Sequence, residues 1–152
     1  IVLPPNIFNI ALSFLANTKI SKILIPKSVG LCDVATFKNC VNLTSIVFED
    51  GGDVPLYVGG DLWLENTQVT ILVLPFKTYR IRGYWRRGSN LNTLYVKSTI
   101  PPILEHGWGD NPDTCDLYVP IGCKEVYASA TNWGSFRTIT EYDFDLNPNN
   151  VH

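Results

Sequence analysis

The stretch Ile23-Leu24-Ile25-Pro26, residues 23–26, decides the fold because its pattern recurs along the chain. Similar apolar triplets stand at residues 1–3, 46–48, 72–74, 94–96 and 117–119. The first residues of successive triplets lie 22, 23, 26, 22 and 23 positions apart. A near-constant period of roughly 20 to 50 residues indicates a repeat architecture.

Other positions follow the same period. A proline comes directly after four of the triplets, at Pro4, Pro26, Pro75 and Pro120. The segment 15–20, which precedes the second triplet, matches residues 64–69 almost position for position. Each triplet is typical of a short β-strand that ends at proline, since proline cannot donate to a strand ladder. Such strands are unstable alone, so the pattern predicts a leucine-rich-repeat-like solenoid. It would stack about six short parallel β-strands, with loops or short helices between them.

Alternate residues of a strand face opposite sides of its sheet. The outer residues of each triplet, such as Ile23 and Ile25, are therefore predicted to fill the core. The middle residues would form a row on the open face of the sheet: Val2, Leu24, Val47, Val73, Tyr95 and Tyr118. Two interpretations of this row remain open. Loops or an adjoining domain cover it, or it binds a partner through its tyrosines.

We expect one domain with a solenoid at residues 1–121, a C-terminal cap at 122–142 and a polar tail at 143–152. A cap keeps the core face of the last repeat away from water. Its expected parts are a helix at 124–130 and a following strand. Val126, Tyr127 and Ala130 would share the inner face of the helix, and Trp133, Phe136 and Ile139 would add bulky cover.

Composition and charge exclude some classes of protein. The chain has 152 residues, 45% of them hydrophobic, and a formal net charge of −2. This balance gives no overall attraction to nucleic acid, and no apolar run is long enough to insert into a membrane. Because the chain begins in a strand-like segment, we expect it to be a fragment of a longer protein. The four cysteines are expected as buried free thiols, although a Cys115–Cys123 disulfide is geometrically conceivable.

Residues 20–40 resemble the repeat of the BspA-like leucine-rich-repeat proteins of bacterial surfaces. The matching positions are Ile20-x-x-Ile23-x-Ile25-Pro26-x-Ser28-Val29, then Cys32, Thr36-Phe37 and Cys40. Cys32 stands where that family usually has isoleucine, and Thr36 where it has alanine. The run Leu117-Tyr118-Val119-Pro120-x-Gly122-Cys123 resembles the closing segment of the same family. The resemblance covers about residues 1–142 and implies an extracellular or cell-surface protein.

Residues 77–87 alternate basic and aromatic side chains, with Tyr84 and Trp85 between arginines. We consider Tyr84 and Trp85 as additional partner-binding residues, since this alternation suits stacking on a polymer or gripping an acidic partner. The plainer and favoured interpretation is a strand in which Tyr79 and Ile81 face the core and the arginines are solvated.

No catalytic residue, metal ligand or cofactor site is predicted. A nucleophile needs a positioned base, and His106 is the only histidine before the C-terminal His152. The alternation Asp143-x-Asp145-x-Asn147-x-Asn149 is similar to a calcium loop, but Pro148 replaces the glycine that such a loop needs. A frayed polar tail is the favoured interpretation.

The expected function is therefore non-enzymatic. The first hypothesis is a secreted or cell-surface binding module that recognises a protein or glycan partner, with adhesion implied by the resemblance. The second is a structural spacer that presents another domain and has no ligand of its own. A third and weaker hypothesis is an enzyme accessory domain that recognises a glycan.

Overall fold

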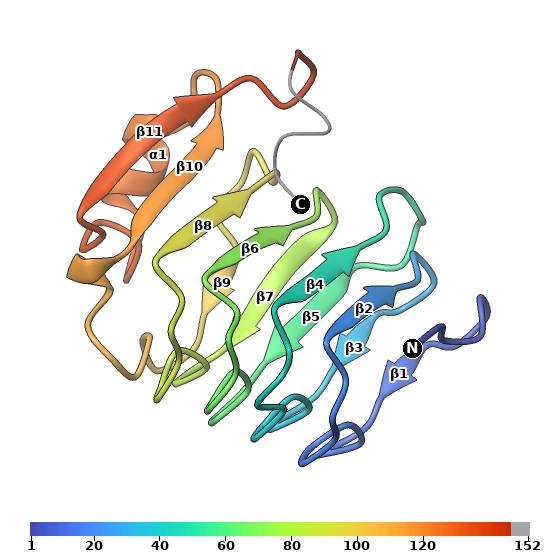
Figure 1. Ribbon diagram of the computed structural model, residues 1–152. Helices are drawn as coiled ribbons and strands as arrows, with labels where there is room; N and C mark the ends of the chain where they lie inside the picture. Colours follow the sequence, from blue (N-terminus) through green and yellow to red (C-terminus); the bar gives the residue numbers. More distant parts are fainter. Residues whose placement is uncertain (147–152) are drawn as a thin grey trace.

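The computed structural model describes residues 1–146 and shows a parallel β-solenoid of about six turns (Figure 1). The predicted rungs form one parallel layer, which we call the front sheet. Its strands are β2 (Lys22–Ile25), β4 (Ser45–Phe48), β6 (Ile71–Leu74), β8 (Thr93–Val96) and β10 (Asp116–Pro120). Equivalent triplet positions lie side by side: Ile23 pairs with Ile46, and Leu94 pairs with both Leu72 and Leu117. The repeat period therefore corresponds to one turn of the solenoid.

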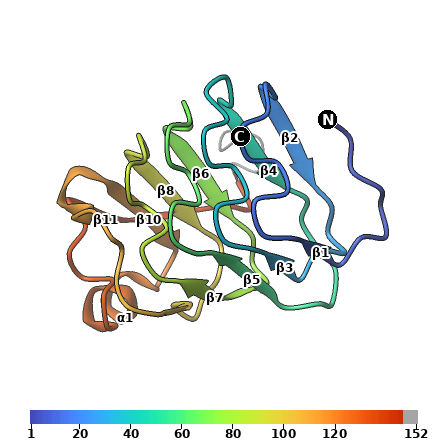
Figure 2. The same cartoon turned by 90° about the horizontal axis from the view of Figure 1, so that it is seen from below.

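The segments between these rungs form a second parallel sheet, of which the sequence predicted a single strand, in the stretch 77–87. This back sheet contains β1 (Asn9–Ile10), β3 (Leu31–Cys32), β5 (Leu56–Gly59), β7 (Thr78–Arg82) and β9 (Ile103–Leu104), in that spatial order. Figure 2 shows the two layers from below, with the chain passing from one to the other in each turn. The core lies between them.

Strand alternation places the triplets as predicted. The outer residues of the triplets are buried, with Ile23, Ile25 and Leu72 each no more than 3% exposed. A column of four tryptophans, Trp63, Trp85, Trp108 and Trp133, runs through the same core, and the ring centroids of neighbours lie 4.9 to 5.8 Å apart. One aromatic ring per turn thus fills the space between the sheets in the last four turns.

The repeated asparagines form a ladder along one corner of the solenoid. Asn17, Asn39 and Asn66 have φ values of 62°, 59° and 56°. Asparagine tolerates this left-handed conformation better than most residues. The Asn66 side-chain amide donates to Asn39 Oδ1 at 2.8 Å, and the Asn39 amide donates to Asn17 Oδ1 at 3.1 Å. The matching segments 15–20 and 64–69 therefore encode a shared tight corner that is bonded from turn to turn.

The first triplet is less regular than the others. Val2 forms a single bridge to Leu24, and its side chain is 92% exposed. Within the described part of the chain, the front sheet consists of a β2–β4 pair and a separate ladder of β6, β8 and β10, which β11 (Thr138–Tyr142) extends. The break between β4 and β6 coincides with the longest triplet interval, 26 residues.

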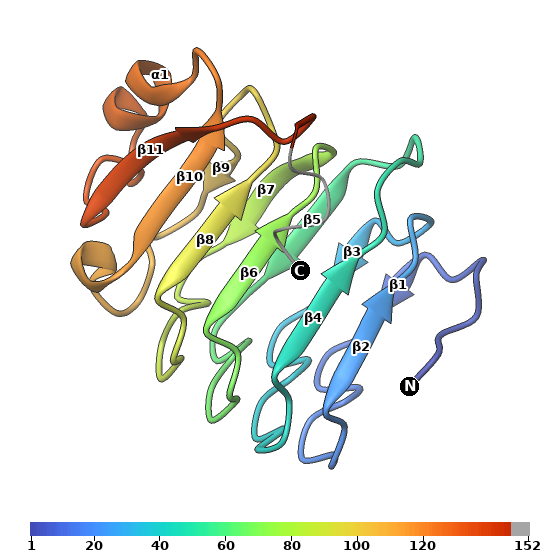
Figure 3. The same cartoon turned by 45° about the horizontal axis from the view of Figure 1, so that its top comes forward.

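The C-terminal end is closed as predicted by a helix and a strand (Figure 3). A 3₁₀ turn at Pro112–Thr114 precedes β10, α1 spans Lys124–Ser129, and β11 (Thr138–Tyr142) pairs with β10. Tyr127 and Trp133 are 0% and 1% exposed. Val126 is 45% exposed, so its predicted place on the inner face of the helix is wrong. Because α1 has six residues, it buries a narrower face than the sequence pattern predicted.

Within residues 1–146, all four cysteines are buried free thiols, so Cys115 and Cys123 are not bridged. Neither helical segment in this range is long or apolar enough to cross a membrane. The outer part of the predicted tail, residues 147–152, lies outside the described residues.

Candidate functional site

The open face of the front sheet presents the predicted row of side chains. We use "open face" for Leu24, Val47, Val73, Tyr95 and Tyr118, the middle residues of the five regular triplets. Register aligns them in two sets, on either side of the break between β4 and β6: Leu24 pairs with Val47, and Tyr95 pairs with both Val73 and Tyr118. The side chains point away from the core, and Leu24 is 48% exposed.

The two ends of this row differ. At the β2 end, Leu24 is half exposed, and Ile71, the first residue of β6 in the middle of the front layer, is 47% exposed. At the β10 end, Tyr95 and Tyr118 stack on each other, and Tyr142 and Phe144 pack against Tyr95 with ring centroids 5.2 and 6.3 Å away. The chain's own C-terminal residues thus cover the aromatic end, while the aliphatic end is open to solvent.

Hydrogen bonds shape the covering segment. Asp143 Oδ1 accepts from the backbone N–H groups of Asp145 and Leu146, each at 3.0 Å. This turn follows β11 directly and carries Phe144. Burial of Tyr95, followed by the nearby Tyr118 and Tyr142, raises the pKa of its phenol. The aromatic end of the open face is therefore a partly desolvated layer.

A hollow of about 680 Å³ lies beside the aromatic end, at the carboxyl ends of the front strands. We call it the acidic hollow, because Asp50, Asp143 and Asp145 line it together with one basic residue, Lys97. Lys97 Nζ lies 2.6 Å from Asp50 Oδ2. Carboxylates therefore outnumber ammonium groups among the residues that line this hollow.

The two aromatic residues predicted at the 77–87 stretch lie in different environments. Trp85 is 1% exposed and packs between Trp63 and Trp108, so its assignment to a binding surface is corrected: it is a core residue. Tyr84 is 40% exposed at a corner, where it has a φ of 64°. The His106 ring stacks on it at 6.2 Å. The chain changes direction at this corner, so strand alternation does not extend through it.

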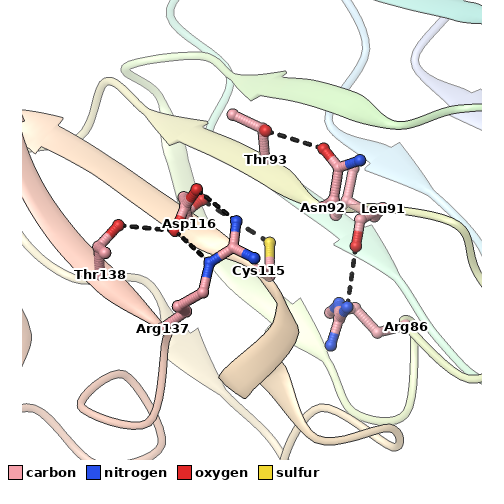
Figure 4. A network of polar contacts seen from close by, with 8 residues as sticks. All are labelled: Arg86, Leu91, Asn92, Thr93, Cys115, Asp116, Arg137 and Thr138. Atoms are coloured by element: carbon pink, nitrogen blue, oxygen red, sulfur yellow. Dashed lines mark hydrogen bonds and ion pairs between the residues drawn. The ribbon is translucent and has the colours of Figure 1, made fainter.

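Arg86 and Tyr79 also depart from the favoured interpretation of this stretch. Arg86 is 3% exposed and donates to the carbonyl oxygens of Leu91 and Asn111, both at 2.9 Å (Figure 4 shows the Leu91 contact). It is a buried structural cation and is not solvated. Tyr79 is 46% exposed because β7 carries a bulge: Leu56 pairs with Thr78 and Tyr57 with Arg80, which leaves Tyr79 without an opposite residue.

A charged network on the back sheet was not found from the sequence. The Tyr57 hydroxyl donates to Glu105 Oε2 at 3.0 Å, and the guanidinium groups of Arg80 and Arg82 each lie 5.8 Å from the Tyr57 ring centroid. Arg82 also pairs with Asp33 at 3.5 Å. Two arginines and two carboxylates balance, so this network carries no excess charge. The arginines were visible in the sequence, but Tyr57 lies in β5 and Asp33 and Glu105 directly follow β3 and β9, three strands that the pattern did not predict.

Two of the buried cysteines are poorly suited to act as nucleophiles. Burial raises the pKa of the Cys32 thiol to about 12 and that of Cys115 to about 11, which disfavours the nucleophilic thiolate. His106 is exposed at a corner and stacks on Tyr84. No three metal-binding side chains come together within residues 1–146. Asn147 and Asn149 of the calcium-like alternation lie outside this range.

A comparison with models of known protein families finds none that matches this chain, and no curated protein matches it either. The structure defines the molecule as a repeat solenoid of short parallel strands. What the chain does must therefore be inferred from its surfaces.

Proposed function

We propose that this chain is a non-catalytic binding module that holds a protein or glycan partner on the open face of its front sheet. The observation that carries the proposal is the apolar row Leu24, Val47, Val73, Tyr95 and Tyr118 on an outward-facing surface. A sheet face exposed to water ordinarily carries polar residues. A contiguous apolar patch marks an interaction site more often than it occurs on an inert surface.

The scaffold supports this role. Repeat proteins commonly bind partners across their extended sheet surfaces. A rigid stack has little conformational freedom to lose when a ligand binds, so binding costs little conformational entropy. The resemblance to BspA-like repeats favours a secreted or cell-surface setting, where a protein or glycan would be the partner. Burial disfavours the thiolate form of Cys32 and Cys115, and this favours a binding role over a catalytic one.

The proposal is tested by charge placed at two half-exposed apolar positions on the outer side of the front sheet, one in β2 and one in β6. Leu24→Lys and Ile71→Lys are compared with wild type for capture on panels of immobilised matrix proteins and glycans. Both positions are about half exposed, so we expect the fold to tolerate lysine. The matched control is Ile103→Lys on the back sheet, where the side chain is 56% exposed.

We expect the two open-face variants to lose capture of the ligand that wild type retains, while Ile103→Lys keeps it. Thermal melting of all three variants should stay close to that of wild type. Equal capture by all variants, or no capture of any panel member, would contradict the proposal.

A structural spacer is the second candidate. The observation that favours it is the coverage of Tyr95 and Tyr118 by Tyr142 and Phe144, which removes part of the row from solvent. A spacer has no ligand to lose. It would therefore capture no member of the protein and glycan panels. The aliphatic end of the row would then contact an adjoining domain.

A further inference from the structure

The acidic hollow is assembled from residues that follow successive front strands. Asp50 comes two residues after β4, Phe76 two residues after β6, and Lys97 directly after β8. Parallel strands in register end at one edge of the sheet, so these side chains meet there although they lie far apart in the sequence. The volume of about 680 Å³ falls in the range of small-ligand sites.

Aromatic rings form much of the wall. Phe76 is 66% exposed, an unusual position for a phenylalanine, and lines the hollow. Tyr142 and Phe144 line it as well, and their ring centroids are 5.0 Å apart. Aromatic rings present negative faces that attract cations, most strongly where water is partly excluded.

The charged side chains of the hollow also favour a cation. Asp50, Asp143 and Asp145 line the hollow, and Lys97 is engaged with Asp50 at 2.6 Å. Lys97 offsets Asp50, and the carboxylate of Asp145 adds negative charge, which repels phosphate, sulfate and carboxylate groups and attracts ammonium or guanidinium groups. Apolar walls with an acidic rim suit a lysine or arginine side chain, whose aliphatic stem packs while its head remains charged.

The hollow is continuous with the open face. Tyr142 and Phe144 line the hollow and also pack against Tyr95 in the open-face row. The aliphatic part of the row adjoins the hollow too, because Asp50 and Phe76 come three residues after Val47 and Val73 on β4 and β6.

We propose that the acidic hollow receives a lysine or arginine side chain from an extended segment of a protein partner that lies on the open face. This inference rests on the proposed function and narrows its partner to a basic protein segment. A neutral glycan is an alternative outcome of the test.

The test titrates the isotope-labelled full chain with a capped Leu-Lys-Leu peptide and follows the amide NMR signals of the residues that line the hollow. The same peptide with an N-acetylated lysine, which has no charge, is titrated in parallel, as is a neutral glucan oligosaccharide. We expect the charged peptide to shift the signals of Lys97 and Asp145 and to bind more weakly as salt is added. The acetylated peptide and the sugar should not shift them.

Two variants give effects of opposite sign. Asp145→Asn removes one negative charge and should weaken peptide binding roughly threefold to fivefold, the size expected for an exposed ionic contact. Lys97→Gln removes the competing ammonium and should strengthen binding by a similar factor. Glu125→Gln in α1 makes the same charge change as Asp145→Asn at a site away from the hollow and should leave the affinity unchanged.

Weaker binding by Lys97→Gln, unchanged binding by Asp145→Asn, or preference for the sugar or the acetylated peptide would overturn the inference. If the peptide fails to bind but Leu24→Lys still abolishes partner capture, only the basic ligand is wrong and the binding role stands. If both tests fail, the open face itself is not a binding surface.

Discussion

The rings of Tyr95 and Tyr118 stack on neighbouring rungs with centroids 4.5 Å apart and planes 15° from parallel. Tyr142 stands edge-on to both rings, at 5.2 and 6.0 Å. Offset stacks and edge-to-face pairs are the two favourable arrangements of aromatic rings. This end of the open face therefore contributes to the stability of the solenoid as well as to its surface.

We predict that Tyr95→Leu lowers the free energy of unfolding by about 1 to 2 kcal/mol, because an aromatic pair contributes about 0.5 to 1.5 kcal/mol and Tyr95 makes several such contacts. Urea denaturation followed by circular dichroism measures the loss. Leu24→Ser at the exposed end of the same row should change stability by less than about 0.5 kcal/mol. Similar losses for the two variants would show that the tyrosine contacts do not stabilise the fold.

The cap should be sensitive to loss of Trp133. This side chain is 1% exposed, donates from Nε1 to the Pro102 carbonyl oxygen at 2.9 Å, and packs against Trp108. Trp133→Ala is expected to cost about 3 to 5 kcal/mol, since it leaves a large cavity beside the last turn. The control Val126→Ala, on the exposed side of α1, should cost much less. Equal melting temperatures for the two variants would contradict burial of Trp133 under the cap.

The rungs of the front sheet could be predicted because one period controls both sequence and structure. Each triplet lies beside the next, so residues 22 to 26 positions apart in sequence become neighbours in space. Alternation then separated Ile23 from Leu24 correctly. The need to shield the last repeat from water identified Trp133 and Phe136 as cover for the last turn, and both are buried.

The back sheet could not be predicted by these means. β1, β3 and β9 have two residues each, too few for an alternating pattern to stand out. The bulge that exposes Tyr79 and the corner that buries Trp85 depend on pairing with other turns, so local spacing carries no sign of them. Coverage of Tyr95 by Phe144 is likewise a tertiary contact, made by residues that the repeat does not include.

The third prediction concerns the contribution of the buried Arg86 to stability. Its guanidinium donates to carbonyl oxygens of Leu91, Asp110 and Asn111, which lie in the chain that leads into β8 and β10. We predict that Arg86→Ala lowers the free energy of unfolding by about 3 kcal/mol or more, because buried carbonyls lose a charged donor. The control Arg82→Ala removes an exposed ion pair with Asp33 and should cost at most about 1 kcal/mol. A smaller loss for Arg86→Ala than for Arg82→Ala in the same denaturation assay would contradict its structural role.

The bond between the cap strand and the last rung should give the protein a specific acid sensitivity. Arg137 donates to Asp116 from Nε to Oδ1 at 2.8 Å and from Nη2 to Oδ2 at 2.6 Å, and Thr138 donates to Oδ1 (Figure 4). These hydrogen bonds, Arg137 first, lower the pKa of Asp116 from 3.8 to about 2. A carboxyl whose pKa is lower in the folded state stabilises the fold when it is ionised.

Its contribution is therefore complete above the ordinary pKa of 3.8, declines as the pH falls through that value, and is gone below about pH 2. We predict that Asp116→Asn destabilises the protein at pH 6 and that the difference from wild type shrinks steadily between pH 4 and pH 2. Urea midpoints measured at closely spaced pH values test this directly. Asp53→Asn, in the loop between β4 and β5, provides a control for the same change of charge. A difference between Asp116→Asn and wild type that is constant from pH 6 to pH 2 would show that the Arg137 contact does not stabilise the ionised carboxyl.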